Sequence, residues 1–280
     1  MYKDILIPDV NEDSARAPIA AAMALAETFE SHIAMLVTVD VPAPMPSDWG
    51  AMAYDLYARL HEEARKRARE RADALRGKFA HASVPFELRI AEAVSLYPQN
   101  AAALQARYAD LTVLPSMPRD GTGNMLVHDY FHEVLRHSGR PVLVVPEGNT
   151  AAMPPKRAVI AWKPTREASR AIADAMPLLR KADAIDVLVI DPVVGEAAHG
   201  GEPGADIAAH LARHGLKVEA VTRPSMNFSV TYALLEYART VGADLIVAGG
   251  YGHSRLREAM LGGTTRELLQ TAHLPVLFSH

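Results

Sequence analysis

The sequence predicts an α/β fold that is built twice, each copy being a doubly wound domain around a five-stranded parallel sheet. Three observations lead to this prediction: short continuous apolar runs, helical stretches between them, and a repeat that relates the two halves. Short apolar runs are typical of strands that helices cover on both faces. At 280 residues, the chain is long enough for two domains of ordinary size.

The expected strands alternate with helices through each half. They lie at residues 5–8, 33–39, 85–90, 111–114 and 142–145 in the first half, and at 158–161, 184–190, 217–222, 245–248 and 276–279 in the second. Alanine-rich stretches at 14–29 and 166–181 follow the first strand of each half and predict helices. In such folds ligands bind outside the carboxyl ends of the strands.

The repeat shows in matching tripeptides. Ala109-Asp110-Leu111 matches Ala243-Asp244-Leu245, and Pro141-Val142-Leu143 matches Pro275-Val276-Leu277. Both pairs differ by 134 positions (243 − 109 and 275 − 141), so the segments align without a gap. The sequence therefore predicts one domain over residues 1–147, a linker over 148–155 and a second domain over 156–280.

Composition narrows the classes of partner. A net charge of −4 gives no general reason to expect nucleic acid or an acidic membrane as a partner. The absence of cysteine excludes disulfides and thiolate metal sites. The sequence shows neither a signal peptide nor an apolar run of about 18 residues, so we expect a cytoplasmic protein without a transmembrane helix.

A basic stretch at residues 60–79 has two interpretations. It holds Arg65, Lys66, Arg67, Arg69 and Arg71 close together. Glutamates are interleaved with them, and Glu62–Lys66 and Glu63–Arg67 lie at helical pairing distance. An apolar stripe runs through Leu60, Ala64, Ala68, Ala72, Leu75 and Phe79. A solvated helix with one buried face is favoured over a nucleic-acid patch.

A glycine-spaced loop follows the fourth strand of the second half. It reads Gly249-Gly250-Tyr251-Gly252, then nine residues, then Gly262-Gly263-Thr264-Thr265. Glycine lets backbone N–H groups approach an anion, and a following helix adds unpaired N–H groups. Thr264 and Glu267 have capping-box spacing, so the helix is expected to start at 263–265. Local spacing alone leaves open a phosphate cradle or a plain turn with a cap.

With these features the chain resembles a tandem member of the universal stress protein family. That family has a five-stranded parallel fold of the adenine-nucleotide-hydrolase-like type. Its nucleotide-binding members carry the motif G-x2-G-x9-G-(S/T), whose glycine positions correspond to Gly249, Gly252 and Gly262. The resemblance implies ATP, with Mg²⁺, in the second half. The residues expected on the phosphate side are Gly249, Gly252, Gly262, Gly263, Thr264, Thr265 and Arg255.

Two positions depart from the family pattern. Gly263 stands where the family has serine or threonine, which keeps a backbone donor and removes a side-chain contact. Lys163 stands where nucleotide-binding relatives have an acidic residue that holds the nucleoside, and a lysine cannot accept a hydrogen bond. By resemblance, Ile190 and Asp191 follow the second strand where backbone contacts adenine. Asp191 is either a replacement acceptor or a turn residue.

The first half lacks the glycine cradle. At the offset of 134, the three glycines correspond to Pro115, Pro118 and His128, and Gly263 corresponds to Asp129. Proline has no N–H to donate, and a carboxylate repels phosphate. Asp9 lies near the family's acidic position with the register off by one. We expect no nucleotide binding of the family's kind in this half.

Three functions remain in competition. The leading prediction is a regulatory stress protein that binds ATP or a related nucleotide without dedicated catalysis. The second is an interaction protein, or a binder of another anion at the same loop, whose halves pair through their final strands as in a family dimer. The third is an enzyme. The chain has neither a G-x-G-x-x-G turn after its first strand nor a G-x-x-x-x-G-K-[ST] motif, although slow nucleotide hydrolysis stays open.

Histidines at 128 and 132 share a helix face if the segment is helical, and His137 lies nearby. Asp129 or Glu133 could assist in binding a metal. Because no third ligand is defined by the spacing, a polar surface helix is favoured over a metal site.

Overall fold

Strands and helices alternate along the computed structural model. It describes residues 1–10, 15–39, 50–79, 83–92, 97–117, 124–149, 151–192, 201–251 and 263–280. The first half contains β1 (Asp4–Pro8), α1 (Arg16–Phe29), β2 (His32–Val39), α2 (Gly50–Phe79), β3 (Phe86–Glu92), α3 (Pro98–Ala106), β4 (Leu111–Pro115), α4 (Asn124–His137) and β5 (Val142–Val145). The second contains β6 (Arg157–Ala161), α5 (Arg166–Leu179), β7 (Ala184–Ile190), α6 (Ala205–Arg213), β8 (Val218–Arg223), α7 (Val230–Val241), β9 (Leu245–Gly249), α8 (Gly263–Thr271) and β10 (Val276–Ser279).

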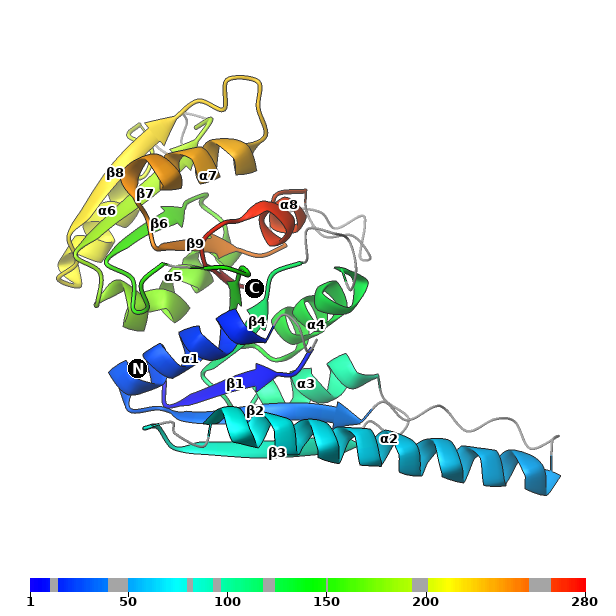
Figure 1. The fold of residues 1–280 in the computed structure, drawn as a ribbon. Helices are drawn as coiled ribbons and strands as arrows, with labels where there is room; N and C mark the ends of the chain where they lie inside the picture. Colours follow the sequence, from blue (N-terminus) through cyan, green and yellow to red (C-terminus); the bar gives the residue numbers. More distant parts are fainter. Residues whose placement is uncertain are drawn as a thin grey trace.

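The strands form one sheet in the order β3-β2-β1-β4-β5-β10-β9-β6-β7-β8. Neighbouring strands within each half are parallel, which confirms the predicted doubly wound fold. The final strands β5 and β10 pair antiparallel, with Val276 opposite Val144 and Phe278 opposite Val142. The two five-stranded sheets are therefore continuous, and Figure 1 shows the halves side by side.

Helices cover both faces of this sheet. One apolar cluster joins α1, α2, α5 and α6 to one face, and a second joins α3, α4, α7 and α8 to the other. In β1, for example, Ile5 and Ile7 belong to the first cluster and Leu6 to the second. Successive strand residues point to opposite faces, so a strand buried on both faces must be apolar throughout. This packing explains the continuous apolar runs in the sequence.

The aspartates of the repeated tripeptides have the same structural role in each half. Asp110 precedes β4, and its Oδ2 accepts hydrogen bonds from the backbone N–H of Lys3 at 2.6 Å and of Asp4 at 3.2 Å. Asp244 precedes β9, and its Oδ2 accepts from Lys156 at 2.9 Å and Arg157 at 3.0 Å. Each carboxylate thus ties the start of the fourth strand to the start of the first.

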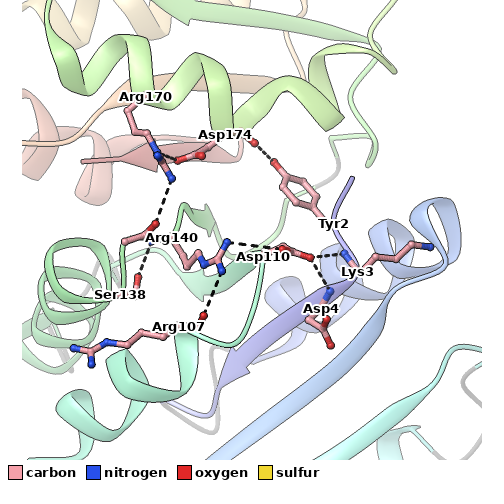
Figure 2. A network of polar contacts seen from close by, with 10 residues as sticks. Tyr2, Lys3, Asp4, Arg107, Asp110, Ser138, Arg140, Arg170 and Asp174 are labelled. Atoms are coloured by element: carbon pink, nitrogen blue, oxygen red, sulfur yellow. Dashed lines mark hydrogen bonds and ion pairs between the residues drawn. The ribbon is translucent and has the colours of Figure 1, made fainter.

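Polar contacts also join the two halves near the starts of the strands (Figure 2). The hydroxyl of Tyr2 donates to the backbone oxygen of Asp174 in α5 at 2.7 Å. Arg170, also in α5, bonds the Asp174 carboxylate at 2.8 Å and the backbone oxygen of Gly139 at 3.4 Å. The residues just before β1 and just before β5 of the first half therefore contact α5, the first helix of the second half.

Helix α2 differs from its prediction in length and in its ion pairs. It begins at Gly50, ten residues before the predicted stretch, and Figure 1 shows its first turns extending past the sheet. The apolar stripe is buried from Ala68 onward, but Leu60 is 41% exposed because it lies on this extension. Glu62 pairs with Arg69, and Lys66 pairs with Glu70, instead of the pairs that the sequence suggested.

Candidate functional site

A cavity of about 480 Å³ opens at the carboxyl ends of β6, β7 and β9 in the second half. This volume lies within the range of small-molecule pockets, roughly 300–1,000 Å³. Seven of the predicted site residues line it: Gly249, Gly263, Thr264, Thr265, Lys163, Ile190 and Asp191. The other three, Gly252, Arg255 and Gly262, lie outside the described residues. The expected phosphate side and nucleoside side therefore share one cavity.

Gly249 ends β9 where the first turn of α5 passes close to the strand. A Cβ atom on residue 249 would lie 2.7 Å from the backbone nitrogen of Ala168 and 2.8 Å from the carbonyl carbon of Glu167. Such distances are not tolerated without a backbone shift. The glycine is therefore required for close approach, and its φ angle is not in the left-handed region.

The start of α8 forms the phosphate-side wall. The helix begins at Gly263, within the predicted window, so Thr264 lies inside its first turn. Glu267 does not complete the expected capping box with Thr264, because its Oε1 accepts a 2.6 Å bond from the Ser229 hydroxyl. The buried Thr265 hydroxyl accepts from the backbone N–H of Tyr251 at 3.4 Å and so ties the loop to the helix.

Three helices begin at the rim of the cavity. Thr165 caps α5 by accepting from the N–H of Ala168 at 3.3 Å, and Ser229 caps α7 by accepting from Tyr232 at 3.0 Å. Residues of the first turns of α5, α7 and α8 line the cavity. Because helix amino termini carry partial positive charge and unpaired N–H groups, this rim favours an anion.

Lys163 and Asp191 line the side of the cavity where the nucleoside is expected. Lys163 is exposed in the turn between β6 and α5, where its backbone oxygen accepts from Thr165 at 2.7 Å. Asp191 has a left-handed φ of 48°, and its Oδ1 accepts from the N–H of Ser225 at 2.9 Å. The hydrogen bonds from Ser225 hold the pKa of Asp191 below its ordinary value. Asp191 is thus an ionised turn residue at the cavity edge.

Several residues that line the cavity were not predicted from the sequence. The apolar ones are Ala161, Trp162, Ala168, Leu188, Val230, Leu234, Ala248 and Leu268. Trp162 could have been predicted to line the cavity, because it directly follows the first strand of this half. Val230, Leu234 and Leu268 had none, since only the packing of α7 and α8 brings them to the cavity. The site therefore has an apolar floor and a polar rim.

In the first half we infer that Tyr130 takes up the space that the cavity occupies in the second half. At the repeat offset of 134, Tyr130 is the counterpart of Thr264. Tyr130 is 2% exposed, and its hydroxyl lies 2.8 Å from the hydroxyl of Thr38, the second-to-last residue of β2. Asp9 is engaged on the α2 side of the sheet, because Arg71 of α2 donates to both of its carboxylate oxygens at 2.7 and 2.8 Å.

Comparison with known proteins identifies the family. A sequence model described as the universal stress protein family matches residues 1–146 and, separately, 156–280. The chain belongs to the universal stress protein family, as a tandem member. A comparison with curated protein sequences finds no match.

Solved universal stress proteins share the fold along almost the whole chain. The structure of a universal stress protein from Archaeoglobus fulgidus aligns with a TM-score of 0.67 and 16% identity, covering 99% of this chain and 95% of that one. A putative universal stress protein from Pseudomonas aeruginosa aligns at 0.53 and 17%, covering 99% and 93%. At such identities the likeness shows the fold alone.

In this tandem universal stress protein the glycine loop is anchored by the first half. The ring of Tyr251, which has a left-handed φ of 61°, lies 5.5 Å from the His132 ring, and the Arg136 guanidinium lies 5.8 Å from its centroid. A Cβ on Gly250 would lie 2.6 Å from a methyl carbon of Leu135. Helix α4 of the first half therefore forms a wall against which the loop of the second half begins.

The histidines of α4 take part in this packing. His128 and His132 stack with ring centroids 6.1 Å apart, and the His128 ring lies 3.1 Å from the Asp129 carboxylate. Burial, with the nearby Arg136 and His128, lowers the pKa of His132, so its imidazole is neutral near pH 7. Within the described ranges, no group of three or more histidine, aspartate or glutamate side chains is arranged to hold a metal ion. Among the same residues, no helix is long and apolar enough to span a membrane.

Proposed function

We propose that the second half binds ATP or a closely related nucleotide, and that the protein acts in stress response or regulation without dedicated catalysis. The observation that carries this proposal is the single cavity shared by the motif residues Gly249, Gly263 and Thr264 and the expected nucleoside-side residues. The proposal includes a cytoplasmic location, no nucleic-acid or membrane partner, and a homodimer as a possible assembly.

The phosphates belong at the start of α8. Backbone N–H groups of Gly263 and Thr264, in the first helical turn, face an anion without needing a side-chain hydroxyl at position 263. This offsets the departure of Gly263 from the family pattern. Asp191 is the only carboxylate among the described lining residues, so Mg²⁺ would enter bound to the phosphates, as it commonly does.

The nucleoside belongs between β6 and β7. Trp162 and Ile190 offer apolar surface to a base, and Asp191 supplies an acceptor. A carboxylate has about four acceptor positions, so the bonds from Ser225 leave capacity for a ribose hydroxyl or an adenine amine. Asp191 thereby takes over the role that the family gives to an acidic residue at the position of Lys163.

A different anion is the second candidate for the same cavity. The observation that favours it is Lys163, which lines the cavity where nucleotide-binding relatives have an acid. A lysine ammonium group attracts a phosphate or carboxylate instead of accepting from a ribose. An interaction protein without any ligand is the third candidate, and the continuous sheet between the halves is compatible with it.

Substitution at Gly263 tests the proposal. A Cβ on residue 263 meets no atom within 4 Å, so Gly263→Asp and Gly263→Asn both fit without a clash. Aspartate reproduces Asp129 of the first half and places a negative charge against the phosphates. Asparagine has nearly the same shape and no charge. Trp162 reports binding by fluorescence once Trp49, the other tryptophan, is replaced by phenylalanine.

Titration with ATP and Mg²⁺ should quench or shift the Trp162 emission in the Trp49→Phe protein. Gly263→Asn should keep most of the affinity, whereas Gly263→Asp should weaken binding at least tenfold because two like charges face each other. Equal affinity in the two variants would place the phosphates elsewhere. Binding of pyrophosphate but not of adenosine or ATP would favour the second candidate.

A further inference from the structure

Helix α2 carries a row of cations whose partners differ. Four of the five cations between residues 65 and 71 pair with carboxylates: Arg65 with Glu92, Lys66 with Glu70, Arg69 with Glu62, and Arg71 with Asp9. Arg67 takes part in no hydrogen bond or ion pair within the described part of the chain. Solvation of a helix face accounts for the exposed ion pairs. Arg67 is also exposed, but it borders a cavity as well.

Arg67 and Arg71 line a second cavity of about 340 Å³ in the first half. They are four residues apart, so they share one face of α2. The opposite wall is formed by the carboxyl ends of β1 and β2, with Asp9, Val37 and Val39. Val37 and Val39 belong to the apolar cluster beneath α1 and α2, so this cavity opens on the opposite sheet face from α7 and α8, which line the nucleotide cavity.

A buried ion pair fixes one arginine of the cavity. The Asp9 side chain is 8% exposed and that of Arg71 is 14% exposed, and two hydrogen bonds of 2.7 and 2.8 Å join them as a fork. Such a bidentate pair holds a guanidinium in one orientation. Asp9 neutralises one of the two arginines, which leaves the cavity with one net positive charge.

We propose that this cavity binds a small molecule through an oxyanion, either a phosphate or a carboxylate group. Arg67 provides the charge-assisted hydrogen bonds, because a guanidinium fork matches both groups. The Arg71–Asp9 pair forms the polar back of the site, and Val37, Val39 and Ala64 form an apolar wall for the body of the ligand. The volume suits a ligand at the small end of the pocket range.

The site would use the half of the molecule that lacks the glycine cradle. It does not rest on nucleotide binding in the second half, because no residue is shared between the two cavities. The first half would then have its own ligand site on the face covered by α2. Its helix α4 would still pack against the start of the glycine loop of the second half.

Inorganic phosphate and citrate are the probes, titrated at constant ionic strength with chloride as the balancing anion. Arginine Nε–Hε resonances report binding by NMR, and the resonance that disappears in Arg67→Gln is that of Arg67. Arg67→Gln removes an exposed charge that has no partner among the described residues, so the fold should persist. Lys66→Gln is the matched control, since it removes an adjacent positive charge outside the cavity.

All titrations are made in the Gly263→Asp background, which is expected to weaken anion binding at α8, and the Arg67 resonance reports the first-half cavity separately. At least one probe should shift the Arg67 resonance saturably, with a Kd that is unchanged in Lys66→Gln and raised about tenfold or more in Arg67→Gln. Ala64→Met, which fills the cavity without changing charge, should weaken citrate more than phosphate. The proposal is overturned if neither probe shifts the parent resonance, or if Arg67→Gln and Lys66→Gln bind alike.

Discussion

Gly249 shows how one missing methyl group sets the geometry of the site. The backbone of Glu167 and Ala168 lies so close to β9 that a Cβ at 249 would require α5 to move. We expect Gly249→Ala to lower the free energy of unfolding by about 1–3 kcal/mol, the usual cost of overpacking. Gly263→Ala is the matched control, since its Cβ meets open space. Urea unfolding measures both, and equal stability of the two variants would refute this role.

The repeated aspartates give a second prediction at this scale. Asp110 and Asp244 each accept two backbone N–H bonds at the start of a first strand. Replacement of either by alanine leaves those largely exposed donors to water and should cost about 0.5–1.5 kcal/mol of unfolding free energy. Asparagine at the same positions should cost less. Chemical denaturation of the four single variants tests this, and alanine variants as stable as the parent would contradict it.

At the scale of single elements, strands were predictable because their signal is local. An apolar run bounded by turns is imposed on the inner strands by burial on both faces, whereas the edge strands β3 and β8 are half-buried or exposed. Every observed strand lies within two residues of its predicted bounds. The first ten residues of α2 were not predicted. They extend past the sheet, and none of the described side chains at residues 55–59 is buried.

The site was predictable in part for the same reason. The residues that end strands, such as Lys163, Ile190 and Gly249, follow recognisable apolar runs. Leu234 and Leu268 belong to helices that pack over the strand ends. No local sequence pattern predicts that these two side chains line the cavity. The contact of Tyr251 with α4 crosses between the halves and is likewise invisible in the sequence.

That contact makes α4 a test of coupling between the halves. Tyr251→Ala removes the ring packed against His132 and Arg136 and should weaken ATP binding several-fold, because the loop loses its anchor. Tyr251→Phe is the control: the hydroxyl is buried without a hydrogen-bond partner among the described residues, so its loss should leave binding intact. Calorimetric titration of both variants decides the point, and unchanged affinity in Tyr251→Ala would show that the anchor is dispensable.

At the scale of the whole molecule, the halves complete each other's sheet. Separated polypeptides of residues 1–149 and 151–280 would expose β5 and β10 as unpaired edges. Exposed edges pair readily with other strands, so we expect the two pieces to associate with each other in equal amounts, or each with itself. Light scattering after gel filtration measures this. Two stable monomers that do not associate would contradict the role given to the pairing of β5 with β10.

The asymmetry between the halves is the central claim. The first half has the buried Tyr130 at the position where the second half has Thr264, which lines the cavity. Isothermal titration with ATP and Mg²⁺, comparing the parent chain with Thr264→Tyr, tests this most directly. We predict one nucleotide per parent chain and loss of binding in the variant, with the fold retained. Two nucleotides per chain, or an undiminished affinity in Thr264→Tyr, would contradict the assignment of the site to the second half.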